Sequence, residues 1–365
     1  MSKIQILKTL IFLLFTAGSS CFVHAQKENN SYRKVGVRSY VGSVFVHSED
    51  VENTSGARPY AIDIEWSKRF KGQTSWDLCR CYPTTGFVLG YQNYDNEILG
   101  SGAHVAYFVQ YHFLQTSRLS PFIRGTGGVS YNSNPHDFTN NPHNESYSLP
   151  VNFSLQFAGG IEFQWKDQWI FDLSTSFNHI SNGGLEQPNK GINWISLGLG
   201  AYFVPNFTPF MNRQDVQPKV YNDSPWFRRF EIYGSALSRT FEEKERFLVF
   251  GSTFLMGYYL SNLHSLLGGI EWNMDQSLAR KIEVEELNKN HHRISVNVGH
   301  EFILGDFRFS QKIGAYVFDQ LQENDRLYHK WGIAYLHDSG LLFGVEVKAH
   351  RHVAEMIVGK VAFQF

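Results

Sequence analysis

Apolar and polar residues alternate along most of this chain, in segments of about ten residues that end at turn-forming residues. Such alternation places one apolar and one polar face on a β-strand. Helical periodicity is weak, and 276–289 is the best helix or loop candidate. The pattern predicts strands near 34–46, 59–69, 85–93, 103–114, 120–131, 153–165, 168–181, 192–203, 227–239, 247–259, 264–274, 291–303, 306–318, 327–337, 341–352 and 355–365.

The connections between these strands alternate in length. Lys166-Asp167-Gln168 and Leu304-Gly305 are tight turns, whereas 47–58, 132–150 and 182–191 are long and polar. Short turns at one end and long loops at the other are typical of an antiparallel transmembrane β-barrel of the outer membrane. Soluble β-sandwiches also have many short strands. Here, however, the bulky residues share one face and the opposite face is small or polar, which predicts a wet interior.

A segment rich in proline and asparagine, 204–225, divides the strands into two sets. Two all-β architectures fit: a single barrel of about 16 strands, or two tandem barrels of about eight strands each. We expect the single barrel, because two barrels in one chain are rare and because only one end of the chain carries an amphipathic strand that closes on a terminal aromatic, Phe365. The expected organisation is a first half at 26–205, a linker at 206–225 and a second strand set at 226–365.

Residues 1–25 are expected to be a cleaved signal peptide, with Lys3 and Lys8 before a short apolar run and Ala25 at the cleavage position. No later apolar run approaches 18 residues, so no membrane-spanning helix is expected. Aromatic residues make up 16% of the chain, which suits a barrel with an apolar outer surface. The net charge of −1 gives no field favouring nucleic acid, and none is expected as a partner.

The hairpin formed by 168–181 and 192–203 holds the candidate chemistry. The largely apolar odd face of the first strand ends in His179 and Ser181, which point the same way about 7 Å apart at the backbone. The apolar face of the second strand ends at the same loop in Asn193. All three side chains should therefore project outward at one end of the barrel, where polar groups are tolerated near the membrane interface.

This grouping suits ester hydrolysis. A serine becomes a good nucleophile when a neighbouring histidine takes its proton, and that histidine needs an orienting partner. The N–H groups of Asn182 and Gly183, next to Ser181, are candidates to stabilise an oxyanion. The alternative interpretation is that His179 and Ser181 are interface residues at the end of a strand.

The run His179-Ile180-Ser181-Asn182-Gly183-Gly184, followed by Pro188-Asn189-Lys190-Gly191-Ile192-Asn193, resembles the signature of the lipid A 3-O-deacylase family, also described as acyloxyacyl-hydrolase-like. The resemblance implies an outer-membrane barrel that removes a 3-linked hydroxyacyl chain from lipid A. It implies Ser181 as nucleophile, His179 as base and Asn182 as an oxyanion contributor.

One position departs from the family pattern. The best-studied members carry a glutamate twelve positions after the serine, where this chain has Asn193. An asparagine oxygen can orient an imidazole but cannot neutralise its charge. Glu186 in the loop is the alternative orienter. The competing functions are a non-catalytic barrel, porin-like or structural, with a vestigial motif, and an esterase or phospholipase for another acyl substrate.

The remaining expectations concern partners and second-half residues. The expected partners are lipid A in the outer leaflet of the bacterial outer membrane and the surrounding membrane lipids; the sequence does not indicate an oligomeric state. No cofactor or metal is expected, since no phosphate-binding loop or metal-ligand spacing occurs. Cys79 and Cys81 are too close for an unstrained disulfide and are expected to be free thiols. His350 and His352 fall on the polar face of their strand and should point into the lumen.

Overall fold

The structure is a computed structural model. It describes residues 31–72, 75–76, 81–113, 118–207, 224–241, 243–323, 325–351 and 353–365. The expected signal peptide and most of the expected linker lie outside these residues. Among the described residues, no helix is both long enough and apolar enough to cross a membrane.

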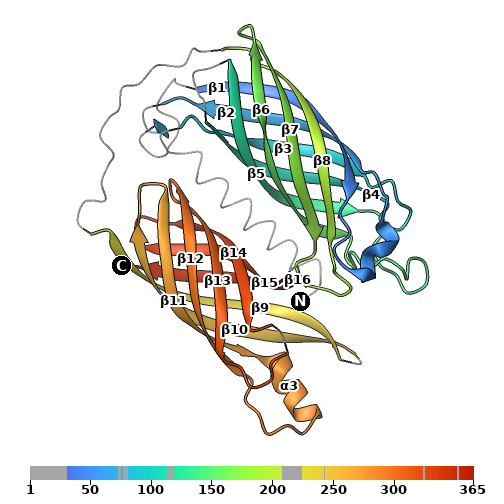
Figure 1. The fold of residues 1–365 in the computed structure, drawn as a ribbon, viewed down its shortest axis with the longest axis vertical. Helices are drawn as coiled ribbons and strands as arrows, with labels where there is room; N and C mark the ends of the chain where they lie inside the picture. Colours follow the sequence, from blue (N-terminus) through green and yellow to red (C-terminus); the bar gives the residue numbers. More distant parts are fainter. Residues whose placement is uncertain are drawn as a thin grey trace.

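The first eight strands form one closed antiparallel barrel, in chain order around the wall (Figure 1). A short 3₁₀-helix, η2 (Glu49–Thr54), lies in the connection between the first two strands. The strands are β1 (Ser31–Val44), β2 (Tyr60–Phe70), β3 (Thr84–Asn93), β4 (Ser101–His112), β5 (Leu119–Asn132), β6 (Val151–Trp165), β7 (Trp169–Ser181) and β8 (Ile192–Phe203).

The second eight strands form another closed antiparallel barrel. One helix, α3 (Gln276–Val284), follows its third strand, and the Asp275 side chain caps it by accepting from the Ser277 N–H. The strands are β9 (Trp226–Phe241), β10 (Glu243–Tyr259), β11 (His264–Asp275), β12 (His292–Leu304), β13 (Phe307–Phe318), β14 (Leu327–Leu336), β15 (Leu341–His350) and β16 (Val353–Gln364).

The expectation of a single barrel of about 16 strands is therefore wrong, and the alternative of two tandem barrels fits. β8 does not continue the sheet into β9. It pairs instead with β1, from Val35 opposite Phe203 to Val44 opposite Trp194. β16 likewise pairs with β9, from Gly359 opposite Gly234 to Gln364 opposite Arg229. Each set therefore closes on itself, although β16 pairs with β9 only over its last six residues, Gly359–Gln364.

The individual elements follow the hydrophobic pattern closely. Every predicted strand exists, and the predicted helix or loop at 276–289 contains α3. Alternation also assigns the faces correctly. Along β7 the odd residues up to Phe177 are exposed and the even residues are buried in the lumen. Outward-facing apolar side chains and an inward polar face are the arrangement that a membrane-spanning barrel requires.

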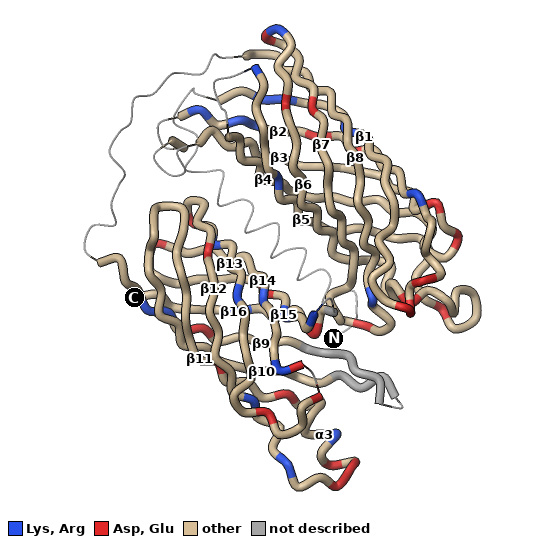
Figure 2. The backbone as a smooth tube through the Cα atoms, viewed as in Figure 1, with Lys and Arg blue, Asp and Glu red and all other residues tan. Residues whose placement is uncertain are grey.

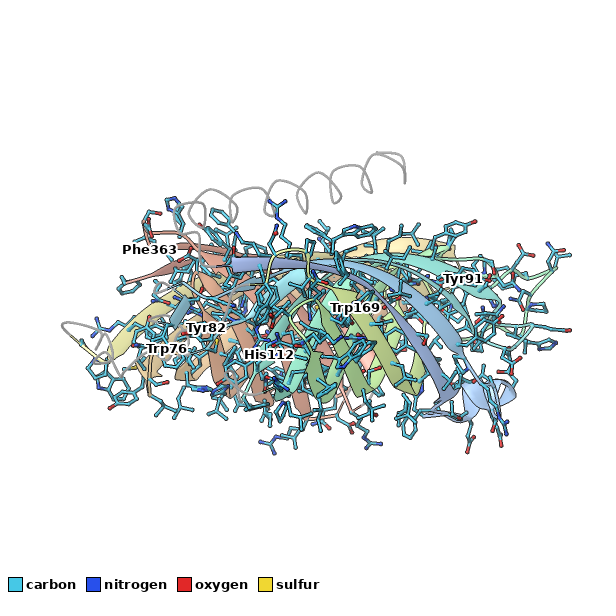
Figure 3. All side chains as sticks on the ribbon, turned by 90° about the horizontal axis from the view of Figure 1, so that it is seen from above. Trp76, Tyr82, Tyr91, His112, Trp169 and Phe363 are labelled. Atoms are coloured by element: carbon cyan, nitrogen blue, oxygen red, sulfur yellow. The ribbon has the colours of Figure 1, made fainter. Side chains whose placement is uncertain are left out.

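Aromatic side chains mark the two ends of the apolar band on the first barrel. Tyr91 and Tyr131 are exposed at the end with the long loops, whereas Trp165 and Trp169 are exposed near the tight turn at the other end. Figure 3 labels two of them, Tyr91 and Trp169. Aromatic girdles of this kind sit at membrane–water interfaces. The long loops and the end of β7 therefore lie at the same interface.

The lumens hold charged side chains that pair with one another, and Figure 2 shows both signs of charge along the strands of both barrels. In the first barrel, Arg124 donates to both carboxylate oxygens of Glu65 at 2.9 Å. In the second barrel, Arg229 contacts Glu301 at 2.7 and 3.0 Å. These side chains are nearly fully buried. Pairing is what makes buried charge tolerable in either interior.

Two smaller expectations have different outcomes. Cys81 is disulfide-bonded, so the expectation that it is a free thiol is wrong. His350 is buried and lies within hydrogen-bond distance of Glu355, 3.2 Å between Nε2 and Oε2, in the lumen as expected. Cys79 and His352 lie outside the described residues.

Candidate active site

His179, Ser181 and Asn193 form one hydrogen-bonded chain on the outer face of the first barrel. His179 Nε2 is 2.9 Å from Ser181 Oγ. His179 Nδ1 is 2.6 Å from Asn193 Oδ1. The imidazole thus contacts the serine hydroxyl on one side and the asparagine carbonyl oxygen on the other. This is the arrangement of nucleophile, base and orienter found in hydrolases with a serine or cysteine nucleophile.

The strand register produces this geometry. His179 on β7 lies directly opposite Asn193 on β8, and side chains of directly opposite residues are within contact distance. Ser181 is two residues further along β7, on the same face as His179. The loop joins the two strands immediately beyond. The contact between His179 and Asn193 is therefore a cross-strand pair that the register of the hairpin fixes.

The site lies at the interfacial end of the apolar band. Ser181 is opposite Phe153 on β6. Val151, two residues earlier on β6, is opposite Tyr131 of the aromatic girdle. Ser181 is therefore one outward-facing position from the girdle, between the apolar wall and the polar loops. An ester at the junction of an acyl chain and a polar headgroup would meet the serine at this depth.

The site is less exposed than the outward-facing wall beside it. Ser181 is 6% exposed and Asn193 is 8% exposed, whereas Phe177 on the same outer face is 44% exposed. Limited contact with water strengthens hydrogen bonds among the three side chains. The serine is thus recessed at the edge of the lipid-facing wall.

Asn182 mainly stabilises the loop that follows Ser181. Its N–H donates to Asn189 Oδ1 at 2.8 Å, and its side-chain amide donates to the Glu186 carbonyl at 2.7 Å and to Ser148 Oγ at 3.1 Å. Gly183, with a positive φ of 68°, has an N–H with no acceptor among the described residues. Of the two expected oxyanion donors, the Gly183 N–H is therefore the one left available.

The far side of the same loop is tied to neighbouring loops. Lys190 and Gly191 donate their N–H groups to the carbonyls of Glu145 and Ser146 at 2.9 and 2.7 Å. The Lys190 ammonium lies 2.8 Å from Asp50 in η2, and this hydrogen bond holds the pKa of the Asp50 carboxyl below its ordinary value. These tethers connect the loop to η2 and to the loop between β5 and β6.

Gly191 lies against the imidazole itself. Its φ is +83°, and a Cβ there would lie 2.9 Å from His179 Cε1 and 3.2 Å from the Ile180 carbonyl oxygen. The position thus requires glycine for its backbone conformation and for its closeness to the base.

Glu186, the alternative orienter, holds the loop through its carbonyl oxygen, while Asn193 occupies His179 Nδ1. Sequence reasoning missed His47, whose Nδ1 lies 3.0 Å from Asn193 Nδ2. His47 follows β1 in a polar loop, 146 residues before Asn193. Because no strand periodicity extends to that loop, alternation carries no signal for this contact.

The fold and the site define a class: outer-membrane β-barrel proteins with an outward-facing serine–histidine pair. Residues 60–202 match the family model described as "Lipid A 3-O-deacylase (PagL)", and residues 228–365 match "Acyloxyacyl hydrolase, C-terminal domain". Together the two matches span well over half of the chain. The chain therefore belongs to the lipid A 3-O-deacylase family and is a protein of the bacterial outer membrane.

Solved structures also resemble this chain, at low sequence identity. The outer membrane enzyme PagL is 23% identical over 45% of this chain and 97% of its own, with a TM-score of 0.35. Neisserial surface protein A is 12% identical over 47% and 96%, with a TM-score of 0.28. The N-terminal barrel of Pseudomonas aeruginosa OprF is 14% identical over 48% and 99%, with a TM-score of 0.28. No curated protein matches the chain.

Proposed function

We propose that this protein is an esterase that removes the 3-O-linked hydroxyacyl chain of lipid A by a serine–histidine mechanism. The observation that supports it most is the hydrogen-bonded chain of Ser181, His179 and Asn193, on the lipid-facing side of the first barrel. Family membership supports the substrate. The interfacial depth of Ser181 suits an ester whose acyl chain is in the membrane and whose sugar lies above it.

In the first half-reaction, Ser181 Oγ attacks the ester carbonyl carbon while His179 Nε2 takes the hydroxyl proton. The Gly183 N–H donates to the carbonyl oxygen as it becomes an oxyanion. When the intermediate collapses, the bond between the carbonyl carbon and the sugar oxygen breaks. His179 returns the proton to that oxygen, and the hydroxyacyl group remains esterified to Ser181.

In the second half-reaction, His179 takes a proton from water, and the resulting hydroxide attacks the acyl-serine. Collapse of this intermediate releases the hydroxy fatty acid and restores the Ser181 hydroxyl. Asn193 Oδ1 accepts the His179 Nδ1–H throughout. Because an amide carries no charge, it orients the imidazole without neutralising the imidazolium.

Mass spectrometry of lipid A from cells that express the protein tests this proposal. We expect wild-type lipid A to lose one 3-linked hydroxyacyl chain, and Ser181→Ala to lower deacylation about 10⁴-fold. Ser176→Ala is the matched control, because Ser176 is a buried serine on the same strand that faces the lumen and contacts Ser196 Oγ at 2.6 Å. Lipid A that is unchanged by the wild-type protein would contradict the proposal.

A further inference from the structure

The Asn193 amide can orient His179 in only one of its two rotations. With Oδ1 toward His179, it accepts the Nδ1–H and leaves Nε2 as the base for Ser181. Rotated by half a turn, its NH₂ would donate to Nδ1, and the imidazole would carry its proton on Nε2, facing the serine. The second tautomer cannot accept the serine proton. Selecting one rotation of this amide is therefore a requirement of the proposed function.

His47 contacts the opposite end of that amide. Asn193 Nδ2 is 3.0 Å from His47 Nδ1, and His47 Nε2 is 2.9 Å from the Lys190 carbonyl oxygen. A carbonyl oxygen only accepts, so His47 Nε2 must carry the proton. His47 Nδ1 also lies 3.4 Å from the Phe45 carbonyl oxygen, but the contact of Nε2 with the Lys190 oxygen is 0.5 Å shorter and decides the tautomer. Nδ1 is then an acceptor in the neutral ring, and the group 3.0 Å from it is the Asn193 NH₂.

The Lys190 carbonyl, which determines that the His47 proton is on Nε2, belongs to a segment held by hydrogen bonds. The N–H groups of Lys190 and Gly191 donate to the neighbouring loop, and the Lys190 side chain pairs with Asp50. The backbone carbonyl oxygen of Asn193 also accepts from the Phe45 N–H at 2.8 Å. This bond ties β8 to the segment that carries His47. The backbone thus holds both ends of the contact.

We propose that His47 is a positioning residue, which fixes the Asn193 amide and thereby selects the His179 tautomer that activates Ser181. This inference rests on the proposed serine–histidine function. A glutamate at position 193 would present two acceptor oxygens and no donor, so it would need no such selection. His47 is therefore the partner that an asparagine orienter requires and a carboxylate does not.

The test compares His47→Leu and His47→Gln in the full-length protein, first with Asn193 and then with Asn193→Glu. Two rates are measured: acyl release from lipid A, and labelling of Ser181 by a fluorophosphonate probe, which needs no lipid substrate. Glutamine can accept from the Asn193 NH₂ and donate to the Lys190 carbonyl, whereas leucine can do neither. His136→Leu is the control, because His136 is also half-buried in a loop of this barrel, where its ring contacts the Asn144 carbonyl oxygen and the Phe138 ring.

We expect His47→Leu to lower kcat and the labelling rate about tenfold with little change in KM, since one oriented hydrogen bond is lost. His47→Gln should keep most of both rates. With Asn193→Glu present, His47→Leu should change either rate less than about twofold, because no amide remains to be oriented. His136→Leu should behave as wild type.

Three results would overturn the inference: unchanged rates in His47→Leu, an equal loss with Asn193 and with Asn193→Glu, or an equal loss in the glutamine and leucine variants. Failure of the proposed function looks different. The wild-type protein would then release no acyl chain, and Ser181 would be labelled no faster than background in Ser181→Ala. If the leucine variant does not fold, His47→Ala replaces it, because alanine also lacks both hydrogen-bonding groups and the same losses are expected.

Discussion

At the scale of single residues, the proposed chemistry depends on a base held between two polar groups at the edge of an apolar wall. His179 has a hydroxyl on one side and an uncharged amide on the other. A carboxylate in place of the amide would stabilise the imidazolium that forms during reaction. In the proposed mechanism Asn193 therefore orients the base but contributes less to the transition state than a glutamate would.

Replacing Asn193 tests this difference. Asn193→Glu should retain or increase the rate of acyl release, because a carboxylate both orients and stabilises the imidazolium. Asn193→Leu should lower kcat by about tenfold or more, because the Nδ1–H loses its acceptor. Steady-state kinetics on purified lipid A measure both. An Asn193→Leu variant as active as the wild type would show that Asn193 is not the orienter.

The sequence pattern could predict the grouping of His179, Ser181 and Asn193 because it depends only on one strand and its hairpin partner. His179 and Ser181 share a face because they are two positions apart in a strand, and any alternating strand has that property. Asn193 joins them through the register of one hairpin. His47 and the use of Asn182 in the loop depend on contacts between distant segments, and alternation within a strand contains no information about them.

At the scale of elements, the loop between β7 and β8 packs against His179 through Gly191. Gly191→Ala should lower the activity, because a methyl group would press on the His179 ring while the backbone keeps a positive φ. The backbone strain alone is about 1–2 kcal/mol. The measurement is acyl release by a variant whose thermal unfolding is followed in parallel.

Gly56→Ala is the matched control for that variant. Gly56 has nearly the same φ, +81°, but a Cβ there would meet no atom within 4 Å. It therefore carries the backbone strain without the contact. Equal activity in the two alanine variants would show that the approach of Gly191 to His179 has no part in the reaction.

The positions of the strands were predictable from sequence, whereas the pairs of strands that close each barrel were not. Each strand is recognisable from the alternation in its own sequence, so the strands and α3 occur where the pattern predicts them. Which strand closes on which depends on pairing between β1 and β8, and between β9 and β16, over long sequence separations. The pattern is the same for one large barrel and for two small ones, and this explains the wrong expectation.

At the scale of the whole molecule, the chain contains two closed barrels, and the described residues of the second include no copy of the serine–histidine pair at the corresponding hairpin. The lumen of the second barrel is crowded with paired charge. Glu346 lies 2.7 Å from Lys312, 3.2 Å from Lys360 and 3.3 Å from Lys330, and all four side chains are buried. Such a filled interior gives no support to a porin-like role.

Glu346→Gln should destabilise the second barrel alone. Removing one carboxylate leaves three buried ammonium groups with less compensation, which costs about 3–5 kcal/mol. Because each barrel closes on itself, we expect one unfolding transition to shift in a urea titration of the protein in lipid vesicles. Acyl release should remain at the wild-type rate, since the proposed site belongs to the first barrel.

Glu283→Gln serves as its control, because Glu283 forms an exposed ion pair with Arg280 on α3. Exposed pairs contribute only about 0–1 kcal/mol. If the two glutamine variants unfolded alike, the lumenal network would not be what stabilises the second barrel.

The most direct test of the central claim is the release of hydroxy fatty acid from lipid A by the purified full-length protein. The account predicts that the wild-type protein and Ser176→Ala release the acid at equal rates, while Ser181→Ala and His179→Ala release it about 10⁴-fold more slowly. Release by Ser181→Ala at the wild-type rate would contradict the claim.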